Sequence, residues 1–575
     1  MNLVLAILSF FGAVLLPGAI LYKIFVKEKF VISTFIIYSF IFSLCFNFVL
    51  ISFLILTRIY TQNIVVGILL IEWIVFLYIF RNEILHGIPA TIQIDNETTK
   101  TCFVIGILIS LYTLNNTMKA DIFYAWDAVV SWNRWASELA NMEFVLNDGG
   151  YPQLYPMLLS LGYVASGKIS SFQGIGVAIW YYFAFVGIVC SVFLLLKDSK
   201  DIAKWSVFGL IIGIITYLSF FHLTNQFFIG YADMPVSMLI LISSLLVLKA
   251  SICLDENDKE NAYKYLILSA FCAGISCQVK QAGLFYIAIY TICLSYLYFK
   301  YKISKKILAL CVFIAVLFLM PWVIIAIYTK IILNMDATNA SYTMNKIYGD
   351  KTPLQRLIAN LWNPFSLFAI ASLFSITSKN KIISIFGIFG FLYFIFWGCF
   401  LSYDLRNMQA GIPFMIIATS YLIYKLLLFK KTKKIFSFLH KKVGLLFIAF
   451  ITIGLIISFF SQEKILQGEY NRKTTLGGKE MSKILLNVYK SRGEKWLLTD
   501  NQPLAYNPNI NKKYYRLFGF GAESDKLLQD LNDFKKDNGA FYILLTKNNY
   551  EIHKDSLKDS IYLGDDGYYI LLEFN

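Results

Sequence analysis

Long apolar segments recur along the whole chain, and they restrict its possible folds more than any other feature. The first of them, LVLAILSFFGAVLLPGAILY, begins at residue 3, with no basic region before it and no small-residue cleavage signal after it. A bilayer has a hydrocarbon core about 30 Å thick and a helix rises about 1.5 Å per residue, so an apolar run of about 18 residues predicts a membrane span. We therefore expect the first run to be a retained span and not a cleaved signal peptide.

The hydropathy pattern predicts about fourteen spans and hence a polytopic α-helical membrane protein. Hydrophobic residues make up 58% of the 575 residues and charged residues only 15%, which is too little polar surface for a soluble chain of this length. The expected spans lie near residues 2–22, 31–56, 64–80, 102–114, 172–196, 205–222, 232–249, 264–278, 282–299, 307–329, 364–376, 382–401, 410–428 and 443–460.

Short basic loops predict how these spans are oriented. The loops KIFVKEK, KDSKDIAK, KYKISKK, SKNK and KKTKKIFSFLHKK all follow odd-numbered spans, so all five fall on one side of the membrane. The positive-inside rule assigns that side to the cytoplasm and places both the N-terminus and the C-terminal tail outside. Because these loops account for most of the net charge of +15, we predict no nucleic-acid partner.

The cysteines indicate neither a disulfide framework nor a metal site. All nine lie between Cys45 and Cys399, in or beside apolar runs, without paired metal-ligand spacing. We expect them to be small apolar core residues.

Three non-membrane pieces are expected on the outer side: loops near 115–170 and 330–363, and the tail over 461–575. Within the tail, KWLLTD, GAFYILLT and YYILLEF are typical of strands, whereas SKILLNVYKS and DKLLQDLNDFKK have helical spacing. We therefore predict a small extracytoplasmic α/β domain, for recognition or shielding.

The first outer loop contains the most polar stretch beside the spans, DIFYAWDAVVSWNRWASELA, at residues 121–140. Its spacing from Asp127 predicts an amphipathic helix lying in the membrane interface, with the tryptophans as an anchoring belt. One face carries Val129, Trp132, Ala136, Leu139 and Ala140, and the other carries Asp127, Ser131, Arg134 and Glu138. Asp127 can act as a base or cap its helix, and the two roles are compatible.

Further polar residues fall at the outer ends of later spans. NQFFIGYADMPVSMLIL places Asp233 at a helix start, CQVKQAGLFY places Lys280 and Gln281 in a short turn, and LSYDLRNMQAGIPF places Asp404 and Arg406 between two spans. Each also has a plain structural explanation: Asp233 as a cap, Lys280 as a snorkelling side chain, and the last two as a surface ion pair.

The predicted topology gathers these acids and bases near one outer surface of the membrane. Asp121, Asp127 and Asp233 supply carboxylates that can take a proton from a hydroxyl nucleophile. Lys280 and Arg406 supply cations that can hold and neutralise a phosphate leaving group. The combination favours group transfer from a lipid phosphate to an acceptor outside the cytoplasm.

Five segments in order, WDAVVSWNRWA, YPQLYPMLLSL, GYADMPVSM, KQAGL and YDLRNMQAGIPF, resemble short segments of the GT-C superfamily of membrane glycosyltransferases. The resemblance is to bacterial relatives of protein mannosyltransferases and of lipid A aminoarabinose transferase, and it covers roughly residues 100–430. It implies a GT-C-like transmembrane catalytic module over 101–460, preceded by additional transmembrane helices over 1–100. It also implies the inner membrane of a bacterial cell, with the active site and the tail domain extracytoplasmic.

The resemblance further implies an inverting transferase that takes its sugar from a polyprenyl-phosphate donor. The acceptor would be a hydroxyl of a glycan, a lipid or a protein. Asp127 matches the acidic position of the family and is expected to be the general base, with Asp121 as its competitor, while Asp233 would orient the acceptor, the donor sugar or the base. The expected substrate-binding residues are Lys280 and Arg406 at the donor phosphate, with Arg134, Gln281, Asp404, Glu138 and Tyr155. Some relatives use a divalent metal, but this sequence has no convincing cage of ligands, so we expect no metal and no other cofactor.

Two functions of other classes remain open from the sequence. A transporter or flippase of a lipid-linked glycan would use many spans and intramembrane charges equally well, although it should carry such charges near the bilayer midplane. A non-catalytic scaffold would bind cell-envelope glycans through its tail domain.

Overall fold

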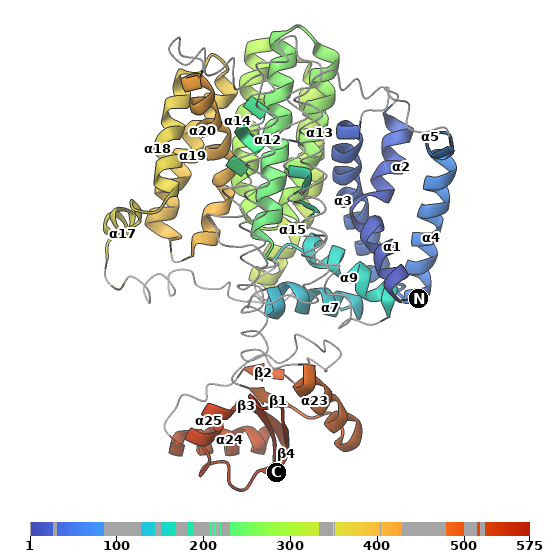
Figure 1. The fold of residues 1–575 in the computed structure, drawn as a ribbon, viewed down its shortest axis with the longest axis vertical. Coiled ribbons are helices and arrows are strands. Elements are labelled where there is room, and N and C mark those ends of the chain that lie inside the picture. The colour runs from blue at the N-terminus through green and yellow to red at the C-terminus, as the bar shows by residue number, and fades with distance from the viewer. Residues whose placement is uncertain are drawn as a thin grey trace.

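The computed structural model describes residues 2–26, 32–85, 128–143, 151–167, 231–332, 351–402, 404–427, 479–499, 515–517 and 524–575, with Gly349 and isolated positions between 179 and 219. These residues form a helical bundle, which extends to residue 427, and a small domain built on a sheet, which begins at residue 479 (Figure 1). The bundle has one apolar core, and the sheet domain has a separate core on each face of its sheet.

Six of the described helices are long and apolar enough to span a membrane, and two bent helix pairs bring the number to eight. The six are α3 (Ile32–Leu56), α4 (Gln62–Ile79), α12 (Asp233–Asp255), α14 (Ala282–Tyr301), α15 (Lys305–Ile327) and α19 (Lys381–Phe400). The bent pairs are α1 (Asn2–Val14) with α2 (Leu16–Phe25), and α17 (Pro353–Asn360) with α18 (Phe365–Leu373). The chain is therefore a multi-pass membrane protein.

The predicted number of about fourteen spans is not confirmed, since the described residues hold six to eight. The spans expected near 102–114 and 443–460 lie outside the described residues, and those expected near 172–196 and 205–222 are described only at isolated positions. The span expected near 364–376 is instead the second arm of a pair that bends by 100° after α17, a helix inside the expected outer loop. Two further apolar segments form shorter or more polar helices, α13 (Lys259–Cys277) and α20 (Ile412–Leu427).

The centre of the bundle is α12, whose apolar stretch is buried along its whole length. It packs against α13, and small residues allow the close approach: Ser243 Oγ donates to the Ser269 carbonyl at 2.8 Å. On the next face of α13, a Cβ added to Gly274 would lie only 2.8 Å from the carbonyl oxygen of Ala315 in α15. Because lipid is as apolar as a leucine, membrane helices associate through such close packing and interhelical hydrogen bonds.

The N-terminal helices form a tight group at the edge of the bundle (Figure 1). In α2 the backbone N–H of Gly18 donates to Ser43 Oγ of α3 at 2.9 Å. The side-chain amide of Asn47, also in α3, donates to the carbonyls of Gly12 and Ala13 at 2.8 and 3.0 Å. The eight described cysteines are free and seven of them are buried, as expected for apolar core residues.

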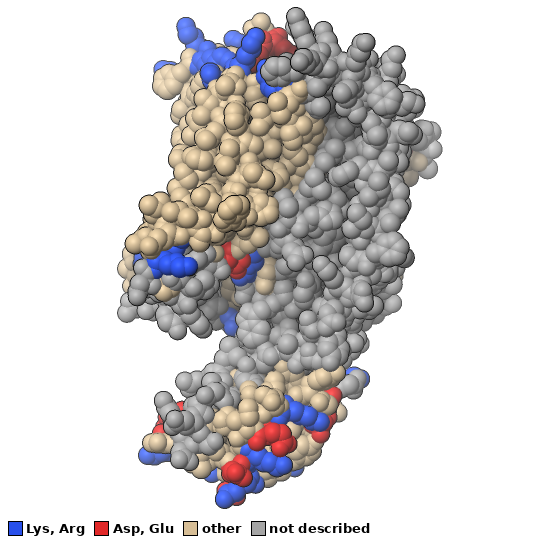
Figure 2. All heavy atoms as spheres, turned by 60° about the vertical axis from the view of Figure 1, so that its left-hand side comes forward, with Lys and Arg blue, Asp and Glu red and all other residues tan. Residues whose placement is uncertain are grey.

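Three of the predicted basic loops meet at one end of the bundle, here called the basic end. Lys300 at the end of α14 pairs with Asp255 at the end of α12, and Asn380 before α19 donates to Ser251 of α12. Val26, in KIFVKEK, lines a cavity together with Glu260 at the start of α13. Figure 2 shows Lys and Arg side chains crowded at one end of the bundle, next to a flank almost free of charge, as a bilayer requires. The shared side of these three loops is confirmed; its assignment to the cytoplasm stays a prediction.

The tail folds around a five-stranded sheet of order β2-β1-β3-β5-β4. The three strands predicted from the sequence are β1 (Leu497–Thr499), β3 (Phe541–Thr546) and β5 (Tyr569–Phe574), and the two predicted helices are α23 (Lys479–Arg492) and α24 (Ser524–Asn538). Three elements were not expected: β2 (Tyr515–Leu517), α25 (Lys547–Ile552) and β4 (Ile561–Asp565). β1 runs parallel to β2 and β3, and β5 runs antiparallel to β3 and β4.

A buried carboxylate fastens the last strand to the first helix of this domain. Glu573 of β5 pairs with Arg492 at 2.6 Å and with Lys495, both at the junction between α23 and β1. Burial alone would raise the pKa of the Glu573 carboxyl, but the hydrogen bonds from Lys495 and Arg492, together with the positive charges of these two residues, outweigh burial and lower it.

Candidate active site

A buried ion pair joins the start of α12 to the turn between α13 and α14. Asp233, the first residue of α12, is 3% exposed, and its Oδ1 lies 2.5 Å from Lys280 Nζ. The residue in the capping position is Ala232, so Asp233 is not the cap that the sequence left open as an alternative. Lys280 likewise points its ammonium at a carboxylate, and its side chain is only 19% exposed.

The turn that carries Lys280 is held from two sides. The amide of Gln278 donates to the carbonyl of Phe318 in α15, and the carbonyl of Gln278 accepts from the backbone N–H of Leu154. Gln281 follows in the N-cap position of α14 and is partly buried. This bonding fixes the backbone on which Lys280 reaches Asp233.

Arg406 is held between an acid and an aromatic ring. It lies in the 3₁₀ helix η7 (Leu405–Ala410), whose N-cap residue Asp404 accepts from the Arg406 backbone N–H at 2.9 Å and from its Nε at 2.5 Å. Its guanidinium carbon lies 4.2 Å from the ring centroid of Tyr231, two residues before Asp233. The surface ion pair that the sequence left open is therefore present, and a cation–π contact adds to it.

Hydrogen bonds dock η7 against α12 and α19. Ser237 Oγ, one turn after Asp233, donates to the Gln409 carbonyl at 2.6 Å. From α19, the Tyr393 hydroxyl donates to the Asn407 carbonyl at 2.7 Å and Trp397 Nε1 donates to the Asp404 carbonyl at 3.1 Å. The two ion pairs, Asp233–Lys280 and Asp404–Arg406, are thus neighbours, and we call them the paired-charge cluster.

The segment that the sequence predicts as the first outer loop forms a second, separate cluster of aromatic residues. It contains the π-helix η1 (Ala128–Asn133), α7 (Arg134–Ala140) and α9 (Leu154–Ser166). The rings of Trp132 and Trp135 meet edge to face at 4.9 Å, and both contact Tyr151.

The prediction that the tryptophans form an interfacial belt is wrong for these two, because they are only 4% and 2% exposed. They pack inside the protein because the YPQLY segment covers them, and the helix is buried on its polar side as well: Glu138 is 8% exposed and lies 3.4 Å from Arg134 Nε. Trp126, Asp121 and Asp127 lie outside the described residues.

The remaining predicted residues divide between the two clusters. Asp233, Lys280, Asp404 and Arg406 come together in the paired-charge cluster, with Gln281 next to Lys280 in the chain. Arg134, Glu138 and Tyr155 belong to the aromatic cluster, where Tyr155 is fully buried and its ring lies 5.8 Å from that of Trp132. The two clusters are linked where Leu154 donates to Gln278.

Sequence reasoning missed Tyr231, Ser237 and Gln278. A signal existed for the first two, because Tyr231 lies in the same GYADMP segment as Asp233 and Ser237 follows Asp233 by one helical turn. Nothing in the sequence marks Gln278 as the residue that joins three elements.

The paired-charge cluster offers cations that are fixed in place but accessible. An ammonium has three donors and a guanidinium has five, and the side chains of Lys280 and Arg406 keep 19% and 25% of their surface exposed. Each can therefore donate to a phosphate oxygen while it holds its acid. Among the described residues no group of three or more His, Cys, Asp or Glu side chains is placed to hold a metal ion.

No family model matches the chain, and no curated protein matches it in sequence. Among solved structures, the chain is similar to ArnT from Cupriavidus metallidurans in the apo state, with a TM-score of 0.49 and 11% sequence identity. The match covers 82% of this chain and 97% of the ArnT chain. A likeness at this level concerns the course of the chain and transfers no function to it.

Proposed function

We propose that this protein is a membrane glycosyltransferase of the GT-C type, which moves a sugar from a polyprenyl-phosphate donor to an acceptor hydroxyl on the extracytoplasmic side. The observation that carries the proposal is the paired-charge cluster, in which Lys280 and Arg406 are each fixed by an acid at neighbouring helix ends. The cluster lies at the end of the bundle opposite the basic end. α13 begins at the basic end with Lys259 and ends with Cys277, beside the turn that carries Lys280, and at 1.5 Å per residue these two ends of the helix are about 27 Å apart. The positive-inside rule assigns the basic end to the cytoplasm, so the end that carries the paired-charge cluster faces away from it.

The two cations are suited to the phosphate of the donor. Arginine presents its donors in a planar fork and lysine presents a compact charge, and together they can neutralise a leaving phosphate. Asp233 and Tyr231 act as positioning residues that hold the cations where the phosphate arrives. Asp233 is the first residue of α12 and Tyr231 precedes it by two residues, so both are placed by a helix that is buried in the core of the bundle.

The proposed reaction is a single displacement with inversion. A carboxylate takes the proton of the acceptor hydroxyl, the acceptor oxygen forms a bond to the anomeric carbon, and the bond between that carbon and the phosphate oxygen breaks. Polyprenyl phosphate leaves with the electron pair of the broken bond and is held by Lys280 and Arg406. Asp127 is the proposed base, with Asp121 as the competing candidate.

The test uses the full-length protein in proteoliposomes with a panel of short-chain polyprenyl-phosphate sugars and a hydroxyl-bearing glycolipid acceptor. Release of free polyprenyl phosphate together with glycosylated acceptor supports the proposal. Lys280→Met should reduce this release strongly, whereas Lys300→Met, at the basic end, should not. Translocation of labelled lipid without cleavage of the sugar–phosphate bond would instead assign the protein to the transporters.

A further inference from the structure

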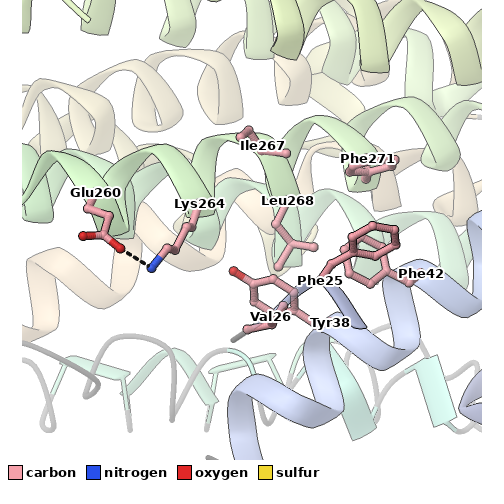
Figure 3. A pocket seen from close by; sticks show the side chains of 9 residues that line it. All are labelled: Phe25, Val26, Tyr38, Phe42, Glu260, Lys264, Ile267, Leu268 and Phe271. Atoms are coloured by element: carbon pink, nitrogen blue, oxygen red, sulfur yellow. Dashed lines mark hydrogen bonds and ion pairs between the residues drawn. The ribbon is translucent and has the colours of Figure 1, made fainter. Parts of the chain in front are cut away.

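A cavity of about 540 Å³ lies between the N-terminal helices and the bundle, at the basic end. Its lining comes from the end of α2, from α3 and from the first three turns of α13, as Figure 3 shows. The lining residues are Phe25, Val26, Tyr38, Phe42, Glu260, Lys264, Ile267, Leu268 and Phe271. Its place at the start of α13 separates it from Lys280, which follows the other end of that helix.

The cavity is polar at one end and apolar at the other. In Figure 3 the Glu260–Lys264 ion pair lies at one end, and Phe42 and Phe271 lie at the other. The rings of Phe42 and Phe271 meet edge to face at 5.6 Å and close the gap between α3 and α13, and Phe318 of α15 packs behind Phe271. The space between α3 and α13 therefore opens from an aromatic floor toward a charged rim.

The depth of the cavity matches one leaflet of a bilayer. From Glu260 to Phe271 the helix advances about 16 Å, which is about half of the 30 Å hydrocarbon core. An apolar cavity of this size is a poor site for water, because its floor offers few polar partners. Its shape and polarity instead follow those of a lipid, with a chain below and a charged group above.

We propose that this cavity binds a phospholipid from the leaflet at the basic end, with an acyl chain between α3 and α13 and the phosphate at Lys264. The Lys264 ammonium lies 2.8 Å from Glu260, but the two side chains are 36% and 82% exposed. An exposed pair of this kind contributes little stability, so the ammonium can turn toward a lipid phosphate. The bound lipid joins the N-terminal helices to the bundle on the side of the Phe42–Phe271 contact that faces the basic end.

The experiment measures phospholipid binding to the full-length protein, purified in a non-ionic detergent, by native mass spectrometry with phosphatidylglycerol. Lys264→Ala should weaken binding about fivefold, which corresponds to ~1 kcal/mol, while Lys300→Ala, at the same end but outside the cavity, should not. Glu260→Gln should strengthen binding, because it removes a carboxylate that competes with the lipid phosphate for the Lys264 ammonium. Ile267→Trp should fill the cavity and displace lipids of every headgroup, whereas Val312→Trp, on the exposed face of α15, should not.

Equal binding by the Lys264 and Lys300 variants, or by the Ile267 and Val312 variants, would overturn the proposal. The wild-type protein gives a test that does not depend on the folding of any variant. Its thermal unfolding temperature should rise with phosphatidylglycerol and stay unchanged with glycerol 3-phosphate, and the same response to both, or to neither, contradicts an acyl-chain site. Because no step measures sugar transfer, the outcome is independent of the proposed function.

Discussion

Lys280→Met removes the ammonium that neutralises Asp233 and leaves a buried carboxylate without its cation. The side chain of Asp233 is 5% exposed, so water can replace little of the lost interaction. Removing one partner of a buried pair costs about 3–5 kcal/mol, because the remaining charge is left uncompensated. We expect this variant to denature at a clearly lower temperature in detergent than the wild type.

The double variant Asp233→Asn with Lys280→Met separates stability from function. It removes both charges, so most of the lost stability should return, and the four proteins form a double-mutant cycle for the pair. If Lys280 also holds the donor phosphate, transfer should stay low even though stability returns. A hydrogen bond to a charged group contributes about 1.5–3 kcal/mol, so the remaining loss in rate should be roughly 10- to 150-fold.

The assay pairs thermal denaturation with initial rates of polyprenyl-phosphate release. The matched control is the Asp255–Lys300 pair, with side chains 47% and 38% exposed, where the same changes should cost less than about 1 kcal/mol. A double variant that regains both stability and transfer would show that the Asp233–Lys280 pair is only structural. A Lys280→Met protein as stable as the wild type would refute the reasoning from burial.

Three further variants test the proposed donor site, the proposed base and the tail domain. Arg406→Lys loses the planar fork of the guanidinium and its stacking on Tyr231, so the KM for the donor should rise and kcat/KM should fall at least tenfold. If the rate depends on donor concentration as in the wild type, Arg406 is not part of the donor site. Asp127→Asn should reduce transfer by about 10²–10⁴ without loss of membrane insertion, and a wild-type rate here, with loss in Asp121→Asn, would reverse the assignment of the base. Because the pKa of Glu573 is lowered in the folded state, its ion pairs stabilise the tail domain at pH values above about 4.3, the pKa of a glutamate in the unfolded chain. This stabilisation is lost as the pH falls through the pKa of the folded state. Glu573→Gln should therefore flatten the decline in amide-exchange protection of β5 at acid pH.

The membrane class follows from the sequence because hydropathy and length measure what a bilayer requires. The position of each span within the bundle does not follow, since lipid and protein are equally apolar surroundings. α12 and α4 are similarly apolar, yet the apolar stretch of α12 is 100% buried and that of α4 only 17%. Which span is central depends on packing between segments far apart in the chain.

The tail shows the same limit on a smaller scale. GAFYILLT and YYILLEF predicted β3 and β5 because both faces of these strands are buried and their apolar runs are continuous. β4 was missed because it is an edge strand, with Ile561 and Tyr562 exposed, and β2 because it has only three residues. Short or half-exposed strands have little hydropathy signal of their own.

In the candidate site, the sequence could indicate which residues share a membrane side but not which of them touch. Alternating spans placed Asp233, Lys280 and Arg406 at the same outer end, and in the structure they are neighbours there. Asp233 and Lys280 are 47 residues apart, so their pairing depends on how α12 and α13 pack. The tryptophans were misjudged for a related reason, because helical spacing describes the faces of a helix and not the segment that covers them.

The pairing of Asp233 also bears on which residue can be the base. To take a proton from the acceptor, this carboxylate would have to weaken its ion pair with Lys280, and that pair is what holds the cation in place for the leaving phosphate. One group cannot serve both demands at the same moment. The proposed mechanism therefore gives Asp233 the positioning role and assigns proton removal to the first outer loop, where Asp127 directly precedes η1 in the sequence. If this division is correct, Asp233→Glu, which keeps the charge for Lys280, should preserve far more transfer than Asp127→Glu, where the position of the carboxylate relative to the acceptor proton decides the rate.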